Sequence, residues 1–208
     1  MNSLLHYLRQ FNAKERFFLI GHVLGNPQFT LDSAFKAELS KALNLSLPSD
    51  LFCAMDFHLD WLYAALRLHA DEGKIRIHAN SDGIIKAQQE DIDFLIGYEA
   101  DGQHHLILLE AKGATGWTNA QMQSKAARFT DIFGNDGCRW PGVVPHFALM
   151  SPRPPQRLLV SNWPQWMSPN GRLAWLRLPI TENLIQVSRC TPDGKPSARG
   201  IHWTVLNR

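Results

Sequence analysis

The 208-residue sequence has only three cysteines, and their positions exclude two common classes of small protein. Cys53, Cys138 and Cys190 are odd in number, far apart, and form no CxxC pair. Disulfide frameworks and zinc knuckles need cysteines at short, paired spacings, so neither is indicated. The chain also lacks a GxSxG motif, and no Walker lysine follows the glycines at 113 and 116. A nucleophile elbow and a phosphate-binding loop are therefore excluded as well.

Long apolar runs are missing too. No uninterrupted run approaches the roughly 20 residues that span a bilayer, and residues 1–18 lack the basic, apolar and small-residue order of a signal peptide. We therefore expect a cytoplasmic protein with no membrane partner. The length and the 45% hydrophobic content suit one domain over residues 1–208. We divide it into an N-terminal helical extension (1–48), a core (50–150) and an Arg/Trp-rich C-terminal part (151–208).

The net charge of +2 conceals an uneven distribution. From Arg139 to the end, eight Arg and one Lys face two acids, which gives +7, whereas the rest of the chain carries −5. Five of the seven Trp also fall in that last third. Arginine interleaved with aromatics suits phosphate contacts and base stacking. The alternative is that Trp fills the core while Arg is solvated at the surface, and the sequence leaves both open.

Hydrophobic periodicity predicts helices in the first third of the chain and again after the middle. Apolar residues on one face, together with capping residues, indicate four helices at Leu4–Phe11, from Asn12 to Gly25, at Thr30–Leu43 and at Leu51–His69. A further helix should begin at Thr115 or Thr118 and run to about Phe133.

Short apolar runs bounded by turn residues predict strands. Asp91–Ile96 and Leu106–Lys112 should form an antiparallel hairpin that turns at Asp101-Gly102. Further strands are expected at Lys74–His78, Ile84–Ile85, Val143–Met150, Leu158–Val160, Leu173–Leu178, Leu184–Val187 and Ile201–Leu206. This order of elements predicts an α/β fold, with a central mixed sheet flanked by helices and a strand-rich C-terminal extension.

The predicted hairpin carries charges next to an aliphatic run. Burying an unpaired charge is costly, so Asp93, Glu110 and Lys112 should be paired, bound to metal or at a cleft. Glu110 and Lys112 are two residues apart on one strand and should leave the same face. Asp91 competes with Asp93 for the role of ligand because both share a strand face, and we favour Asp93, which directly precedes Phe94-Leu95-Ile96.

These residue types suit a magnesium site. Mg²⁺ takes hard oxygen ligands and few of them from protein, which fits Asp93, Glu110 and the carbonyl of Ala111. Lys112 would lower the pKa of an attacking water or neutralise charge on the phosphorus centre. Gln121 and Lys125, one helical turn apart, would orient water or hold a phosphate. Asp60 or Asp56, both on the predicted helix before the sheet, would complete a second metal position or contact the ligands; we favour Asp60, which Leu59, Trp61 and Leu62 surround.

The pattern resembles the PD-(D/E)XK nuclease superfamily over about residues 50–150. Ile92-Asp93-Phe94-Leu95-Ile96 and, after sixteen residues that follow Asp93, Glu110-Ala111-Lys112 resemble the two core strands of that family. Gln121-x-x-x-Lys125 resembles its following helix, although no Pro precedes Asp93. The resemblance implies a restriction endonuclease-like core and Mg²⁺ or Mn²⁺ as cofactor. It also implies DNA as the substrate, with Lys125 and Arg128 as candidate nucleic-acid contacts, and a possible homodimer.

Three functions remain in competition at this stage. The leading hypothesis is a metal-dependent nuclease that hydrolyses DNA phosphodiesters, with Asp93, Glu110, Lys112, Gln121 and Asp60 as catalytic residues. The second is a catalytically inert nucleic-acid-binding or assembly protein on the same fold. The third, a transferase or small-molecule hydrolase, would need a deep apolar pocket instead of an open basic cleft. A simpler explanation of Glu110 and Lys112 is a surface ion pair, worth at most about 1 kcal/mol.

Overall fold

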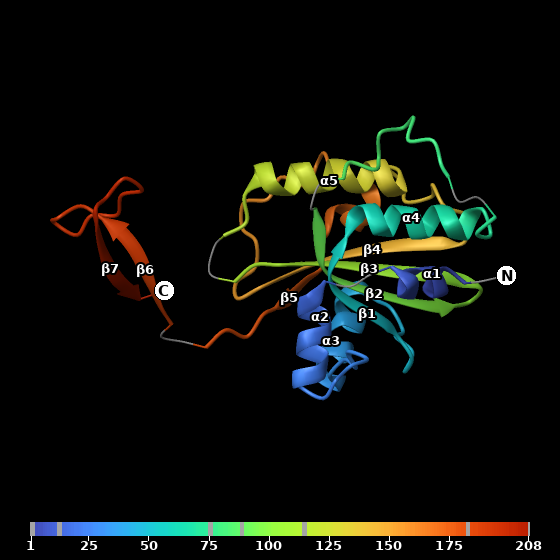
Figure 1. Cartoon of the computed structure of the whole chain (residues 1–208), viewed down its shortest axis with the longest axis horizontal. Coiled ribbons are helices and arrows are strands. Elements are labelled where there is room, and N and C mark those ends of the chain that lie inside the picture. The colour runs from blue at the N-terminus through green and yellow to red at the C-terminus, as the bar shows by residue number, and fades with distance from the viewer. Residues whose placement is uncertain are drawn as a thin grey trace.

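A five-stranded mixed sheet organises the protein (Figure 1). The computed structural model describes residues 3–11, 14–74, 77–87, 90–113, 116–181 and 184–207. In chain order the elements are α1 (Leu4–Gln10), α2 (Glu15–Val23), α3 (Ser33–Leu43), β1 (Phe52–His58), α4 (Leu59–Ala70), β2 (Asp91–Ala100), β3 (Gln103–Ala111), α5 (Asn119–Phe133), β4 (Val143–Ser151), β5 (Trp175–Arg177), β6 (Ile185–Cys190) and β7 (His202–Asn207), with short 3-10 turns at Gln165–Met167 and Pro169–Gly171. The expected α/β architecture with a mixed sheet flanked by helices is confirmed.

Strands β1 to β5 lie in the order of the chain. β1, β2 and β3 pair antiparallel, whereas β4 joins β3 and β5 joins β4 in parallel. The predicted β2–β3 hairpin is confirmed, and Ala100 pairs with Gln103 across a two-residue turn. Asp101 and Gly102 both have positive φ, 51° and 73°, as the tightest hairpin turns require. The helix predicted to follow Lys112 is also confirmed as α5, with the Thr118 side chain accepting a bond from Gln121 N.

The helix predicted over Leu51–His69 is wrong in its first half. Residues 52–58 form β1, which pairs with β2, and α4 begins only at Leu59. The run is apolar on nearly every side, so periodicity alone does not separate a buried strand from a buried helix. The His58 side chain caps α4 by accepting a hydrogen bond from Asp60 N at 3.2 Å. The strand is stabilised by backbone pairing with a segment that lies 33 or more residues away in the sequence.

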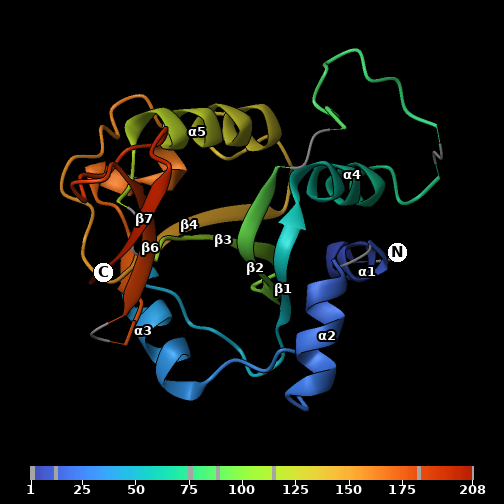
Figure 2. The same ribbon diagram turned by 60° about the vertical axis from the view of Figure 1, so that its left-hand side comes forward.

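Helices cover both faces of the sheet (Figures 1 and 2). On one face α4 and α5 share a core with Leu106 and Leu108 of β3, and α1 packs against α4. On the other face Leu39 of α3 packs with Ile96 and Ile107. Side chains of β3 alternate between the two cores, because successive residues of a strand point to opposite faces. Glu110 therefore shares the face of Leu106 and Leu108, below α5.

After β4, the described residues form three short strands instead of the four predicted. β5, β6 and β7 lie close to their predicted positions, but Leu158–Val160 forms no strand. Of the five Trp in the last third of the chain, four are buried or packed against the core, which supports the packing explanation for them, and Trp203 is exposed. β6 and β7 form a separate two-stranded sheet that extends away from the main sheet (Figure 1).

Two further strand predictions fall between α4 and β2. Ile84 and Ile85 are not in a strand. Of the predicted strand Lys74–His78, residues 75 and 76 lie outside the described part of the chain, while Lys74, Ile77 and His78 adopt no strand conformation and Ile77 is almost fully exposed. Asn12 and Thr115, predicted as helix caps, also lie outside the described residues.

Candidate active site

Asp93 and Glu110 lie side by side on β2 and β3. The β2–β3 register ends with the Phe94–Leu109 pair, and Asp93 and Glu110 are the next residue on each strand. Alternation along the strands puts both on the face of the paired Leu95 and Leu108. Asp93 Oδ2 accepts a hydrogen bond from Ala111 N at 2.7 Å, which holds that carboxylate at the end of β3. The structure thus brings together the two acids that the sequence pattern selected.

Glu110 is a buried carboxyl whose pKa is raised. Only 8% of the residue is exposed. Burial raises its pKa from 4.5 to about 7, since desolvation disfavours the charged form. The charge of Lys125 lowers the pKa, the charge of Asp93 raises it, and Lys112 lowers it to a smaller degree. Glu110 therefore changes its charge near neutral pH, and all three partners lie close enough to influence it.

The raised pKa of Glu110 predicts a pH-dependent stability. Because the folded pKa of about 7 exceeds the ordinary value of 4.5, the protonated form is favoured by folding, and stability falls as pH rises from about 4.5 to about 7. Glu110→Gln keeps the neutral form at every pH. We expect the variant to exceed the metal-free wild type by about 2 to 3 kcal/mol at pH 8 and to match it at pH 4. Urea unfolding at pH 4, 6 and 8 measures this. Glu99→Gln, at a half-exposed acid on β2, is the control, and a difference that does not change with pH would contradict the assignment.

Lys125 joins the two acids to the end of β2. Its Nζ lies 2.9 Å from Glu110 Oε1 and donates a hydrogen bond to the carbonyl oxygen of Asp91 at 2.5 Å. Gln121 lies one turn earlier on α5 and is exposed, so its amide is free to reach a bound ligand. Gln121 and Lys125 thus share one face of α5, with Lys125 held by Glu110 and Asp91 and Gln121 exposed.

Lys112 follows β3 and lies against an aromatic support. Its Nζ is 5.9 Å from the ring centre of Trp117, a distance at which a cation is attracted to the face of an indole ring. The Ser151 hydroxyl accepts hydrogen bonds from the indole N–H groups of Trp117, at 3.2 Å, and Trp175, at 3.0 Å. It also donates to the Arg153 carbonyl at 2.8 Å. The hydroxyl therefore uses its one donor and both acceptor positions, and it fixes the ring beside Lys112.

Asp60 belongs to a different cluster. Its carboxylate accepts hydrogen bonds from Arg128 Nη2 at 2.5 Å and from the backbone N–H groups of Lys86, at 3.1 Å, and Ala87, at 2.8 Å. Arg128 is 2% exposed and also donates to the Ile84 carbonyl. This pair ties α4 and α5 to the segment that precedes β2. The structure thus does not bring Asp60 to Glu110, and the assignment of Arg128 as a nucleic-acid contact is corrected, because its guanidinium is buried in the protein.

Asp56, the alternative to Asp60, lies on β1 near the acids of the hairpin. It stands between Met55 and Phe57, whose partners Phe94 and Ile92 flank Asp93, and the register leaves Asp56 and Asp93 themselves unpaired. Its φ of 50° interrupts the strand at that point, a conformation that Asp tolerates better than most side chains. Asp56, Asp93 and Glu110 thus occupy neighbouring positions on β1, β2 and β3, a row of acids, although the described residues hold no group of three acids able to bind a metal. Sequence reasoning offered Asp56 as an alternative to Asp60 but placed both on a helix.

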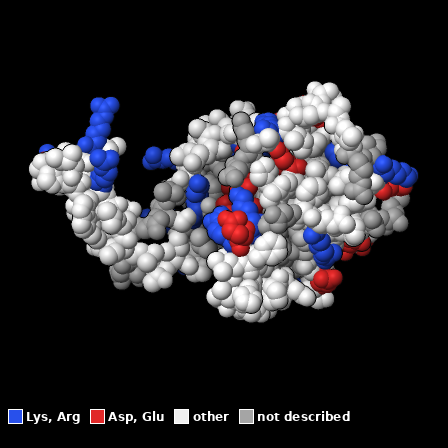
Figure 3. All heavy atoms as spheres, in the orientation of Figure 1, with Lys and Arg blue, Asp and Glu red and all other residues white. Residues whose placement is uncertain are grey.

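Two cations from α2 approach this row of acids. Lys14 pairs with Asp91, and Arg16 Nη2 lies 2.9 Å from Asp56 Oδ2. Both come from the beginning of α2, far from the strands in the sequence. Lys14 and Arg16 were not among the predicted site residues, because no spacing rule along the sequence connects residues of separate elements. Figure 3 shows acidic and basic side chains gathered together near the middle of one face of the molecule.

Two hollows lie near α2. An open, mixed polar hollow of ≈ 900 Å³ is lined by Lys14, Glu15, Arg16, His58, Asp60, Trp61, Ala64, Ile85 and Ala87. An apolar groove of ≈ 440 Å³ lies between α1, α2 and β1. Neither Asp93 nor Glu110 lines the apolar groove, so this apolar pocket does not serve these acids as a small-molecule hydrolase would require.

Asp93 and Glu110 are ligands of the kind that Mg²⁺ binds, although they do not form a complete metal site by themselves. In the described part of the chain, no three His, Cys, Asp or Glu side chains are grouped as a metal site. Mg²⁺, however, is usually bound through one or two carboxylates, with water and phosphate completing the shell. Asp93 and Glu110 supply two hard oxygen ligands on one face of the sheet. Two carboxylates match the number of protein ligands that Mg²⁺ usually takes, and they are too few for an all-protein site.

Comparisons with known proteins identify no relative. No family model matches the chain, no curated protein is similar to it, and no solved structure resembles it at a significant level. Among the residues that the structure describes, no helix has both the length and the apolar character needed to cross a bilayer. The function therefore has to be argued from the geometry of the site.

Proposed function

We propose that this protein is a metal-dependent nuclease that hydrolyses DNA phosphodiester bonds, built on a restriction endonuclease-like core. One observation carries the proposal: Asp93 and Glu110 lie opposite each other on β2 and β3, with Lys112 and Lys125 beside them. Carboxylates that share a face with a nearby ammonium group are the parts that phosphodiester hydrolysis needs.

Each residue has a distinct part in this proposal. Asp93, Glu110 and the carbonyl of Ala111 would hold Mg²⁺ or Mn²⁺. Such an ion, when bound, lowers the pKa of water and offsets phosphate charge. Lys112, steadied by Trp117, neutralises the negative charge that develops on the phosphate oxygens. Gln121 orients the attacking water, and Lys125 neutralises Glu110 when the site is empty and holds a phosphate oxygen when it is filled.

An observation also favours a second candidate. The Lys125–Glu110 ion pair and the lack of a third acid ligand among the described residues suit a protein that binds nucleic acid without cleaving it. In that case the same fold would serve as an inert nucleic-acid-binding or assembly protein. Calorimetric titration with Mg²⁺ and Mn²⁺ separates the two candidates, because only the nuclease requires metal binding that is lost in Glu110→Gln.

Cleavage assays with Lys112 variants test the proposal. The purified chain is incubated with plasmid, linear duplex and single-stranded DNA, and with RNA, in Mg²⁺, Mn²⁺ or EDTA. We expect cleavage of a DNA form that needs the divalent ion, and we expect Lys112→Met to reduce it by about 100-fold or more. Lys195→Met, at an exposed lysine of the β6–β7 hairpin, is the matched control. Cleavage that persists in EDTA, or that is equal in both variants, would exclude this assignment.

A further inference from the structure

The β6–β7 hairpin has an apolar face with no cover. The register pairs Val187 with Val205, Ile185 with Asn207 and Arg189 with Trp203, so these side chains share one face. Ile185, Val187, Trp203 and Val205 are 66%, 70%, 68% and 47% exposed. Together they expose roughly 500 Å² of apolar surface, near the upper end of what a monomer shows in its largest patch. An isolated two-stranded sheet is marginally stable, so this face indicates a contact with another molecule.

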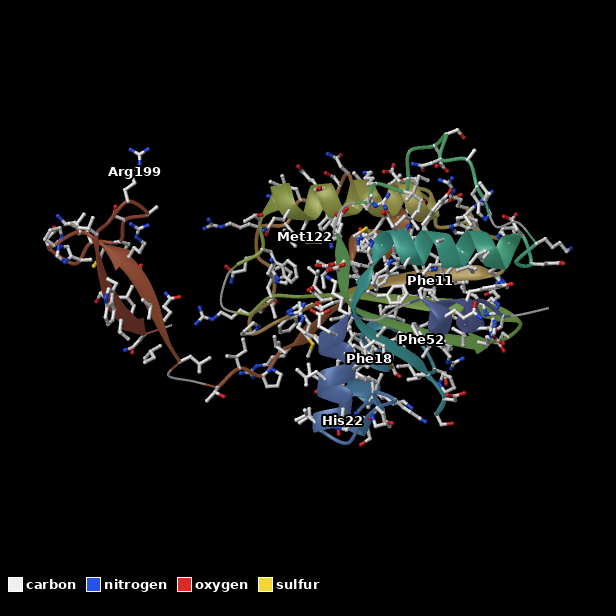
Figure 4. All side chains as sticks on the ribbon, in the orientation of Figure 1. Phe11, Phe18, His22, Phe52, Met122 and Arg199 are labelled. Atoms are coloured by element: carbon white, nitrogen blue, oxygen red, sulfur yellow. The ribbon has the colours of Figure 1, made fainter. Side chains whose placement is uncertain are left out.

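A second exposed apolar surface lies on α2, at the mouth of the groove between α1, α2 and β1. The side chains at the base of that groove are buried, among them Leu8, Phe52, Cys53, Ala54 and Phe57. The exposed part is formed by Phe18 and Leu19, which are 57% and 61% exposed, and by Val23 and Leu24 at the end of the same helix, which are 66% and 72% exposed. Figure 4 places Phe11, Phe18 and Phe52 close together at this junction, and Arg199 on the distant hairpin. The hairpin of the same chain does not reach α2 in either view (Figures 1 and 2).

We propose that the β6–β7 hairpin of one copy, the arm, docks its apolar face on the exposed side of α2 in a second copy, at the mouth of the α1–α2–β1 groove, and that the exchange is reciprocal. Each chain carries both an exposed apolar arm and an exposed apolar patch on α2, so a two-fold axis lets both contacts form at once. Asp50 lies in the groove lining, and Arg189 lies beside Trp203 on the arm, so the two charges can pair at the rim.

The buried area decides between two arrangements of the dimer. If two arms packed only on each other, the total buried area would be about 1,000 Å², below the usual size of a stable interface. Reciprocal docking buries the arm and the exposed apolar side of α2 on both copies, on the order of 2,000 Å² in total, which is the size of a stable complex. The arm also meets α2, the helix whose Lys14 and Arg16 pair with Asp91 and Asp56. The partner's arm would thus contact α2, the helix whose first residues lie near the acids of the site.

Sedimentation equilibrium on the whole chain tests this interface. We expect a dimer at micromolar concentration, with a dissociation constant that rises about 30-fold or more in Val187→Glu and in Phe18→Glu, as for the loss of a central contact. Both side chains are exposed, so the fold should persist by circular dichroism, and Leu19→Glu provides a second groove variant. Gln186→Glu, on the opposite face of β6 and also exposed, is the control and should leave association unchanged.

Cysteine cross-linking distinguishes the partners. With the exposed Cys138 replaced by Ser, a mixture of Trp203→Cys and Phe18→Cys chains should form a disulfide-linked pair that neither forms alone. A chain that stays monomeric at 100 μM, on the order of a Kd of 10⁻⁴ M, overturns the proposal. The proposal is also overturned if Trp203→Cys chains form a disulfide with each other while Phe18→Glu and Leu19→Glu leave association unchanged. That result would indicate that two arms pack on each other. Loss of DNA binding in Val187→Glu without a change in association would assign the arm to nucleic acid instead. None of these outcomes depends on whether the protein cleaves DNA.

Discussion

Asp93→Asn is expected to lower metal-dependent DNA cleavage by about 10³-fold, if the proposed nuclease assignment holds. The asparagine side chain retains an oxygen that can accept the hydrogen bond from Ala111 N, so the end of β3 should stay in place. What is removed is the negative charge beside Glu110. Single-turnover cleavage of the DNA form preferred by the wild type measures the loss, and calorimetry should show weaker Mg²⁺ binding in the same variant.

The control for this substitution lies on the same hairpin. Asp101→Asn removes an identical charge at the exposed turn, where φ is 51°, and asparagine tolerates that conformation. It should leave both cleavage and metal binding unchanged. If Asp93→Asn cleaves as fast as Asp101→Asn, the carboxylate of Asp93 has no part in the chemistry and the nuclease proposal loses its main support.

Arg128→Met is expected to destabilise the fold by about 3 kcal/mol or more. The substitution leaves the Asp60 carboxylate buried without its ion pair, and it also removes the hydrogen bond to the Ile84 carbonyl. Two backbone N–H groups still bind Asp60. The loss of unfolding free energy should therefore lie at the lower end of the range for a broken buried ion pair. Urea unfolding at pH 7 gives the free energy. The double variant Asp60→Asn/Arg128→Met should recover a large part of the lost stability, since no unpaired charge remains at this position.

A surface pair provides the comparison for Arg128. Lys86 and Asp131 lie 3.7 Å apart and are both well exposed, so Asp131→Asn should cost under about 1 kcal/mol. The alternative role of Arg128 predicts a different result. If Arg128→Met left stability intact and weakened DNA binding, the guanidinium would have to be accessible to nucleic acid, contrary to its burial against Asp60.

The hairpin that carries the site was predictable because its signals are local. Asp101-Gly102 determines a two-residue turn, and the turn sets the register that brings Asp93 opposite Glu110. The Thr118 cap of α5 is local in the same sense. The turn and the helix cap depend only on the conformational preferences of neighbouring residues, so the local sequence is enough to predict them.

The elements around the hairpin depended on distant contacts. The segment at 52–58 has an apolar pattern compatible with a helix or a strand, and pairing with β2 selects the strand. Because residues 52–58 form a strand, Asp56 lies on β1, beside the part of β2 that contains Asp93. Asp60, the second residue of α4, forms an ion pair with Arg128 instead. Lys14 and Arg16 reach the acids from α2 by packing that no sequence spacing encodes.

By itself, the sequence determined an α/β protein with a charged hairpin, one site acid on each of its two strands, and a cation two residues beyond Glu110. Only the tertiary structure decided which other charges join them, which of Asp56 and Asp60 lies at the row, and how strongly Glu110 is desolvated. Turn geometry and strand alternation act over a few bonds, so they can be read along the chain. Burial and ion pairing depend on which surfaces exclude water together, and that is settled only when distant segments pack.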